Sequence, residues 1–238
     1  MAIGKDVTDL QSVIGYDFCD LSYLDCAMTH SSYTNEQRVK GIVAPSNERL
    51  EFLGDAILQL VISDYLYENY KKFREGALTK MRQKLVCERT LSRIAETISL
   101  GEYLNIGHGE EQNDCRKRPK ILADALEALI GAVYLDEGER CGARLRELVI
   151  SLFSDEILSA SVMARTDYKT MLQQLAEQDG AAILEYKTVC ESGPEHDKLF
   201  EVVAYVNNNE VGRGVASVKK EAEMQAAKMA LELFGVQI

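Results

Sequence analysis

The feature that most constrains this chain is a pair of long apolar segments that carry acidic residues at helical spacing. Residues 48–70 read ERLEFLGDAILQLVISDYLYENY, and residues 120–136 read KILADALEALIGAVYLD. Three acids in the first segment, at i, i+3 and i+7, share one helix face, and two in the second, at i and i+3, share another. Because helices this apolar belong in a core, we expect these carboxylates to be partly desolvated and to need compensation.

Two such helices facing each other would gather four or five carboxylates, which cannot all stay ionised without a cation. Oxygen ligands suit Mg²⁺, and a metal held in this way can activate water and stabilise charge on a phosphodiester. Acid pairs at this spacing are, however, more often solvated helix faces or partners of Lys and Arg, and Arg49 lies nearby. Spacing alone leaves both interpretations open.

The first part of the chain follows a helical pattern, without any long stretch that alternates with period two. Besides the two apolar segments, helices are predicted over residues 78–99 and 140–159, and Asn47 is predicted to cap the helix that follows it. The fold class predicted for residues 1–158 is therefore an all-α domain. Residues 159–166, SASVMART, are small and weakly patterned, and we predict a short linker there.

A different pattern begins at residue 167. It predicts a helix, three strands and a final helix, at residues 167–178, 183–189, 199–206, 210–217 and 219–234. The tripeptide Asn207-Asn208-Asn209 predicts a tight hairpin turn between the second and third strands. This α-β-β-β-α order over residues 167–238 predicts a small α+β domain with two helices on one face of a sheet.

The charge balance argues against a nucleic-acid partner when it is taken alone, because the net charge is −11. Residues 1–160 hold 19 Lys and Arg against 26 Asp and Glu, and the remaining residues hold 8 against 12. Neither part is basic, so any contact with a nucleic acid would have to come from local clusters.

Cysteine spacing and hydropathy restrict the class of protein further. No two of the six cysteines are closer than seven residues, which excludes CxxC zinc or redox motifs, and we expect free thiols, several of them buried. The most apolar run, residues 121–135, contains two acids, so no membrane partner is expected. The start, MAIGKDVTDL, lacks a secretory signal pattern. We expect a cytoplasmic protein.

Two longer sequence words favour the metal interpretation of the acids. Asn47 to Asp55 reads NERLEFLGD, and Lys120 to Gly131 reads KILADALEALIG. Together with Thr29-His30-Ser31-Ser32, Arg74-Glu75-Gly76 and residues 107–111, they closely resemble the ribonuclease III family. The resemblance covers nearly all of the first 155 residues.

This resemblance implies an endonuclease domain that acts as a homodimer, in which each subunit supplies one site and cuts one strand of an RNA duplex. By position, the implied Mg²⁺ ligands, with Mn²⁺ able to substitute, are Glu51, Asp55, Asp124 and Glu127. Of these, Asp55 and Glu127 are the catalytic acids most tied to turnover. Glu48 and Glu75 match secondary acidic positions. Phe52 matches an aromatic at the dimer interface, although an ordinary core Phe is an equal alternative.

The implied products carry 5′-phosphate and 3′-hydroxyl ends with staggered 3′ overhangs, and the implied substrates are ribosomal RNA precursors and structured messenger RNA. No Ser, His or Lys is placed as an obvious nucleophile on the acidic helices, so hydrolysis by metal-bound water is the consistent mechanism. His30 is interpreted as a cap or hydrogen-bonding residue near a helix end, and His108 has no assigned role.

The C-terminal part resembles a double-stranded RNA-binding domain through DYKTMLQQLAE, GPEHDKLF and KKEAEMQAA. Such domains contact 2′-hydroxyls and phosphates across successive grooves of A-form RNA. The implied RNA-binding residues are Thr170, Gln173, His196, Lys198, Lys219 and Lys220. Glu177 and Val218 depart from the family pattern, which often has Gln at the first position and Ser or Thr at the second. With the acidic balance of this part, they predict weak RNA binding by the isolated module.

The leading hypothesis is therefore a Mg²⁺-dependent endonuclease that cuts double-stranded RNA. The alternative is a non-catalytic RNA-binding or scaffold protein that kept the fold, and the presence of all four acids, Glu127 in particular, favours the enzyme. An unrelated all-helical metal phosphohydrolase would normally need histidine ligands, and three scattered histidines argue against it.

Overall fold

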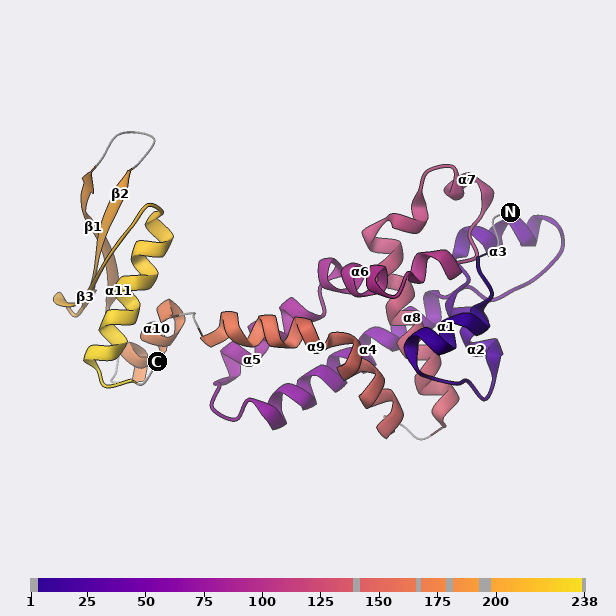
Figure 1. Ribbon diagram of the computed structural model, residues 1–238, viewed down its shortest axis with the longest axis horizontal. Helices are drawn as coiled ribbons and strands as arrows, with labels where there is room; N and C mark the ends of the chain where they lie inside the picture. Colours follow the sequence, from indigo (N-terminus) through magenta and orange to yellow (C-terminus); the bar gives the residue numbers. More distant parts are fainter. Residues whose placement is uncertain (1–3, 139–141, 166–167, 179–181, 193–197, 237–238) are drawn as a thin grey trace. The chain divides into compact units, whose positions relative to one another are not determined.

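The computed structural model describes residues 4–138, 142–165, 168–178, 182–192 and 198–236. Contacts divide the chain into two units, residues 1–160 and residues 161–238, and the boundary falls within the last turns of the helix α9 (Ala143–Arg165), which is given below with the first unit (Figure 1). We describe them separately.

Among the described residues of the first unit, helices are the only regular elements, apart from one isolated bridge between Thr29 and Asn105. This confirms the all-α prediction. The elements are α1 Val7–Ile14, α2 Leu21–Ala27, α3 Ser31–Val39, α4 Glu48–Asn69, α5 Glu75–Leu85, α6 Glu88–Thr97, η1 Leu100–Tyr103, α7 His108–Glu111, η2 Cys115–Lys117, α8 Pro119–Glu137 and α9 Ala143–Arg165.

The centre of this unit is the packing of α4 against α8, the two apolar segments of the sequence. Gly54 of α4 lies against the backbone carbonyl of Glu127, and Gly131 of α8 lies so close to Leu50 that a Cβ there would be 2.5 Å from the Leu50 carbonyl oxygen. Side chains at these two glycines would push the helices apart. The buried core around this crossing includes Leu50, Ile57, Leu58, Val61, Leu126, Leu129, Ile130 and Val133.

Local signals explain where α8 begins and ends. Pro119 is its first residue, where the missing N–H has no helical partner to lose. Gly138 ends the helix in the left-handed conformation, with φ of 72°. Asn47 stands at the N-cap position of α4, as predicted, but its side chain makes no capping hydrogen bond. Asn47 is buried, and its backbone N–H donates to the Thr29 carbonyl at 2.9 Å.

Two segments differ from the sequence-based expectation. Residues 78–99 form two helices, because the chain turns at Cys87, which is extended, and the Thr90 hydroxyl donates to the Lys84 carbonyl at 2.8 Å. The predicted linker at residues 159–166 is helical as far as Arg165, the last residue of α9. Ala160 and Ser161 are only 2% and 4% exposed there. The small side chains that suggested a linker are therefore buried side chains of a helix.

The second unit contains α10 Tyr168–Gln178, β1 Leu184–Ser192, β2 Leu199–Val206, β3 Asn209–Ala216 and α11 Lys219–Leu233. The predicted α-β-β-β-α order is confirmed. The strands form an antiparallel sheet in the order β1-β2-β3 (Figure 1). Asn207 and Asn208 make the hairpin turn with φ of 49° and 65°, a region that Asn tolerates better than most residues, and Asn209 begins β3.

The second unit has two buried hydrophobic clusters, and the larger one joins both helices to the sheet. Leu172 of α10 meets Ala204 and Val211 of the sheet and several residues of α11: Ala226, Ala227, Ala230 and Leu231. Alanines on α11 allow the helix to lie close to the strands. The unit therefore has a hydrophobic core of its own.

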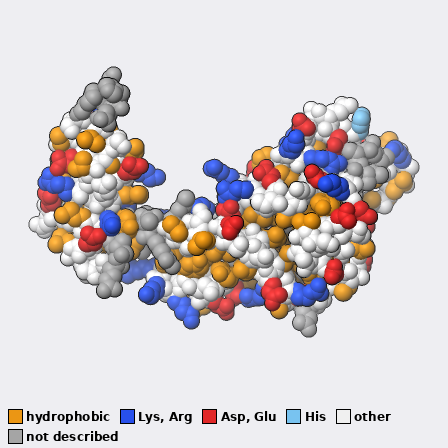
Figure 2. Space-filling model, viewed as in Figure 1, with side chains coloured by type: hydrophobic (Ala, Val, Ile, Leu, Met, Phe, Trp, Pro, Cys, Tyr) orange, Lys and Arg blue, Asp and Glu red, His pale blue; other side chains and the backbone are white. Residues whose placement is uncertain are grey.

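The surface carries charges of both signs. On the face seen in Figure 2, Lys and Arg side chains are interspersed with Asp and Glu over both units. No described helix has the length and apolar character needed to cross a membrane. The described cysteines are all free, and of these only Cys115 is fully buried, fewer than expected.

Candidate metal centre and RNA-binding module

The crossing of α4 and α8 brings acids from both helices together. Glu51 of α4 and Asp124 and Glu127 of α8 each offer a carboxylate oxygen, and these oxygens lie within 4.8 Å of one another. All three side chains are half-buried. We call these three residues the carboxylate cluster.

Asp55, the fourth predicted ligand, has its carboxylate turned along its own helix. Both of its oxygens accept hydrogen bonds from the Gln59 side-chain amide, at 2.8 and 3.0 Å. Its charge nevertheless acts on Glu127, since it is one of the causes that raise the pKa of that residue. Asp55 therefore lies beside the carboxylate cluster without belonging to it.

Glu127 is the most perturbed acid of the cluster. Burial raises its pKa from 4.5 to about 8, and the negative charges of Asp55, Asp124 and Glu51 act in the same direction. The pKa of Glu51 is also raised, first by burial and then by Asp124. Crowded, half-buried carboxylates of this kind favour protonation unless a cation compensates them.

The donor set fits Mg²⁺. It consists of carboxylate oxygens from two helices, without the nitrogen or sulfur that zinc sites usually contain. A hard divalent cation would supply the missing positive charge, so Glu51, Asp124 and Glu127 are the residues that would hold it.

Lys120 is a member of this site that the sequence analysis missed. Its ammonium group forms an ion pair with Asp124 at 3.1 Å, one helical turn away, and its charge lowers the pKa of both Glu51 and Glu127. The i, i+4 spacing of Lys120 and Asp124 was a signal for this pair.

The remaining predicted residues of the first unit lie outside the cluster. Glu48 is exposed and accepts a hydrogen bond from the Ser46 hydroxyl at 3.1 Å, and Glu75 accepts one from Thr79 at 2.8 Å. His30 caps α3, since its ring nitrogen accepts from the Ser32 N–H, which confirms its structural interpretation. Burial lowers the pKa of His30, so its neutral, accepting form is favoured.

The C-terminal unit presents most of the predicted RNA-binding residues. Lys219 and Lys220 are exposed in the first turn of α11, where the helix dipole also favours an anion. Lys198 is exposed and lies 3.9 Å from Glu191. Thr170 is half-buried, whereas Gln173 is exposed on α10. His196 lies outside the described residues.

The two departures from the family pattern have visible consequences. The Gln173 amide donates to Glu177 at 3.1 Å, so this acid engages a residue predicted to contact RNA. Val218 stands at the N-cap position of α11 and provides no side-chain cap.

Comparison with known proteins shows which families the two parts of the chain resemble. Residues 20–155 match the model of a Ribonuclease-III-like family, and residues 168–233 match that of the Double-stranded RNA binding motif. The chain is 44% identical to "Ribonuclease 3" of Natranaerobius thermophilus, over 96% of both chains. The chain belongs to the ribonuclease III family. It is therefore an endoribonuclease with a double-stranded RNA-binding motif.

Other ribonuclease III proteins are similar to this chain over most of their own length. "Ribonuclease 3" of Listeria monocytogenes serotype 4a is 42% identical over 94% of this chain and 95% of its own. The solved nuclease domain of ribonuclease III from Campylobacter jejuni is 37% identical, with a TM-score of 0.53, and covers 64% of this chain and 94% of its own. The match in fold thus extends over the unit that holds the carboxylate cluster.

Proposed function

We propose that this ribonuclease III member hydrolyses double-stranded RNA with Mg²⁺ held by Glu51, Asp124, Glu127 and, after rotation of its side chain, Asp55. The observation that carries the proposal is the carboxylate cluster, in which the pKa of Glu127 is raised to about 8. Mn²⁺, which also accepts oxygen ligands, is expected to substitute.

Each part of the site has a separate task in this proposal. A bound divalent cation supplies an activated water and stabilises charge on the phosphodiester. Glu51, Asp124 and Glu127 fix the position of the cation, and the raised pKa values of Glu51 and Glu127 favour the exchange of a proton for the cation at these two residues. Asp55 has to leave Gln59 before it can contribute an oxygen, so it is the mobile carboxylate of the set. Glu48 and Glu75 are proposed as secondary acidic positions near the substrate.

The products proposed are 5′-phosphate and 3′-hydroxyl ends with staggered 3′ overhangs, from ribosomal RNA precursors and structured messenger RNA in the cytoplasm. RNA would be held by Thr170, Gln173, His196, Lys198, Lys219 and Lys220. These groups suit recognition of duplex shape and phosphates more than recognition of bases.

The proposal includes a homodimer, because α4 exposes a row of large apolar side chains. Phe52, Leu60 and Tyr67 are 82%, 56% and 75% exposed. Their spacing keeps them within about 80° on one side of the helix; we call them the α4 stripe. The core alternative for Phe52 is wrong. The Campylobacter jejuni nuclease domain is described as having a region involved in dimer formation, and a partner subunit would bury the α4 stripe.

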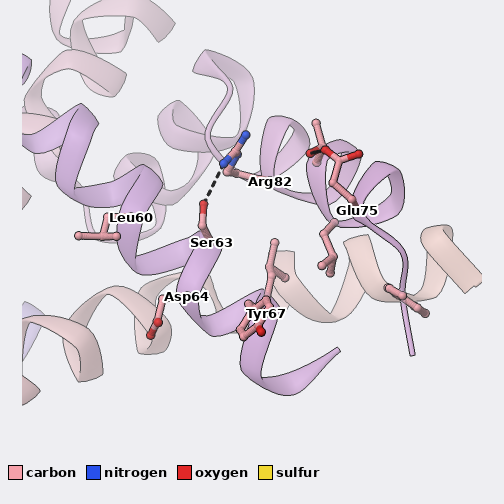
Figure 3. Close-up of a pocket in the computed structure, with 10 residues that line it drawn as sticks. Leu60, Ser63, Asp64, Tyr67, Glu75 and Arg82 are labelled. Atoms are coloured by element: carbon pink, nitrogen blue, oxygen red, sulfur yellow. Dashed lines mark hydrogen bonds between the residues drawn. The ribbon is translucent and has the colours of Figure 1, made fainter. Parts of the chain in front are cut away.

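An open pocket beside the α4 stripe supports this surface as one that receives another chain. Its volume is about 570 Å³, and it lies between α4 and α5 (Figure 3). Leu60 and Tyr67 line it from α4, while Arg82 of α5 donates to the Ser63 hydroxyl at 3.0 Å. Two residues of the α4 stripe thus line a hollow, and exposed apolar surface of this kind favours protein contact.

The test is cleavage of a long RNA duplex with Mg²⁺ by the wild type and Glu127→Gln. We expect the wild type to cut and the variant to bind without cutting, since the amide keeps the shape of the side chain and removes its charge. Glu68→Gln, at the far exposed end of α4, is the matched control and should cut normally. Analysis of product ends checks the 5′-phosphate and the overhang. A wild type that binds duplex but is inert with both Mg²⁺ and Mn²⁺ would support the scaffold alternative.

A further inference from the structure

Lys120 lies at the edge of the carboxylate cluster, and its ammonium group contacts both carboxylate oxygens of Asp124. The ammonium group is 3.1 Å from one carboxylate oxygen of Asp124 and 3.4 Å from the other. The Lys120 side chain is 73% exposed, while that of Asp124 is 25% exposed. A solvated cation therefore contacts a partly buried anion.

In this position the Lys120 ammonium group can take the place of a bound metal cation beside Asp124. The oxygens of Asp124, Glu51 and Glu127 are gathered within 4.8 Å, and the Lys120 ammonium already neutralises one of the negative charges. A divalent cation that ligates Asp124 has to share this carboxylate with the ammonium or displace it. Two cations at one carboxylate repel each other, and an exposed lysine moves away easily because it has little packing to lose.

We propose that Lys120 is a resident counter-ion of the carboxylate cluster, which holds Asp124 in the metal-free protein and competes with the divalent cation for it. This inference rests on the proposed metal site. Its consequence is that Lys120 sets the metal concentration at which the site fills. The metal-free cluster is stabilised by the lysine, and metal binding includes the release of the lysine from Asp124.

The experiment measures metal binding to the full chain without RNA. Mg²⁺ and Mn²⁺ are titrated by calorimetry into the wild type, Lys120→Gln, Lys120→Arg and Lys71→Gln. Lys71 is the matched control, because it is an exposed lysine that follows the opposite end of α4, on the order of 20 Å from Asp55 along the helix axis. Thermal unfolding in EDTA is recorded for all four proteins.

We expect Lys120→Gln to bind Mg²⁺ about three- to tenfold more tightly than the wild type, as the loss of one nearby positive charge predicts. Its metal-free form should unfold at a lower temperature, because the cluster has lost its counter-ion. Lys120→Arg keeps the charge and should resemble the wild type in both measurements. Lys71→Gln should also resemble the wild type, which would exclude an effect of net charge alone.

Two different failures are distinguishable. If the wild type binds Mg²⁺ and Lys120→Gln binds it equally or more weakly, the counter-ion inference is overturned while the proposed function stands. If none of the four proteins binds Mg²⁺ or Mn²⁺, the proposed metal site itself is wrong, and the inference is overturned with it.

Discussion

Replacement of Glu127 by Gln is expected to stabilise the protein when divalent metal is absent, even though it removes activity. The carboxyl group of Glu127 has its pKa raised from 4.5 to about 8 by burial and by the neighbouring charges of Asp55, Asp124 and Glu51. At neutral pH in the unfolded chain this group is ionised at no penalty, whereas in the folded chain ionisation is opposed. An amide of the same shape avoids that opposition.

The sign and size of the effect follow from the shift. Because the folded-state pKa lies above the unfolded value, the folded protein binds more protons between these two values, and its stability falls as pH rises from about 4.5 to about 8. The full shift would correspond to roughly 5 kcal/mol at about 1.4 kcal/mol per pKa unit. Glu127 is only half-buried, so solvent screening reduces the expected loss to about 1–3 kcal/mol.

The assay is thermal unfolding of the full chain in EDTA at about pH 5 and about pH 8.5, followed by addition of Mg²⁺. At the higher pH the Gln variant should melt above the wild type, by about 2–4 °C for each kcal/mol of stabilisation. At the lower pH the two should nearly coincide. Mg²⁺ should stabilise the wild type and have a smaller effect on the variant. Equal melting temperatures in EDTA at both pH values would refute the electrostatic reasoning.

Three further outcomes are expected. Phe52→Ala should weaken self-association by about 2 kcal/mol, roughly 30-fold, in sedimentation measurements, because a large exposed anchor is removed; an unchanged dimer constant would contradict the α4 stripe as the interface. Gly54→Ala should destabilise the chain by about 1–3 kcal/mol in denaturant unfolding, because a methyl group would overlap the Glu127 carbonyl, whereas Gly109→Ala, which has open space around it, should not. The second unit should bind duplex RNA weakly, with salt slope on the order of 2–3, and Lys219→Gln with Lys220→Gln should remove most of it; tight binding with a steep slope would contradict the predicted weakness.

The sequence predicts the elements well where apolar periodicity is long and uninterrupted. The apolar stretches of α4 and α8 identify both helices, and the residue range of β2 is predicted to the residue. Asn207-Asn208 predicts its turn because few residues other than Gly and Asn accept positive φ at both positions. These signals are local in the sequence, so they can be interpreted without knowledge of the tertiary structure.

The errors arise where individual side-chain contacts, rather than apolar periodicity, decide the outcome. Asn47 stands where a cap is expected and is buried, but its side chain makes no capping hydrogen bond. The break at Cys87 lacks Gly or Pro, and it depends on a hydrogen bond from Thr90. Asp55 was placed on the correct helix, yet the rotation of its carboxylate toward Gln59 cannot be read from spacing. The i, i+4 spacing indicated the Lys120–Asp124 ion pair, but not that the Lys120 charge also acts on Glu51 and Glu127.

The free energy by which the carboxylate cluster destabilises the fold is small compared with the stabilisation from the hydrophobic core beneath it. The loss expected from ionised Glu127 is about 1–3 kcal/mol, while full burial of a single Leu or Ile contributes about 1.5–3 kcal/mol. Leu126, Leu129 and Ile130, which flank Glu127 on α8, are completely buried. The metal-free fold should therefore persist, and substitutions of the acids should change metal binding and chemistry without unfolding the chain. Loss of cleavage in a folded Glu127→Gln protein then reports on the site itself, which is what separates the enzyme from the scaffold alternative.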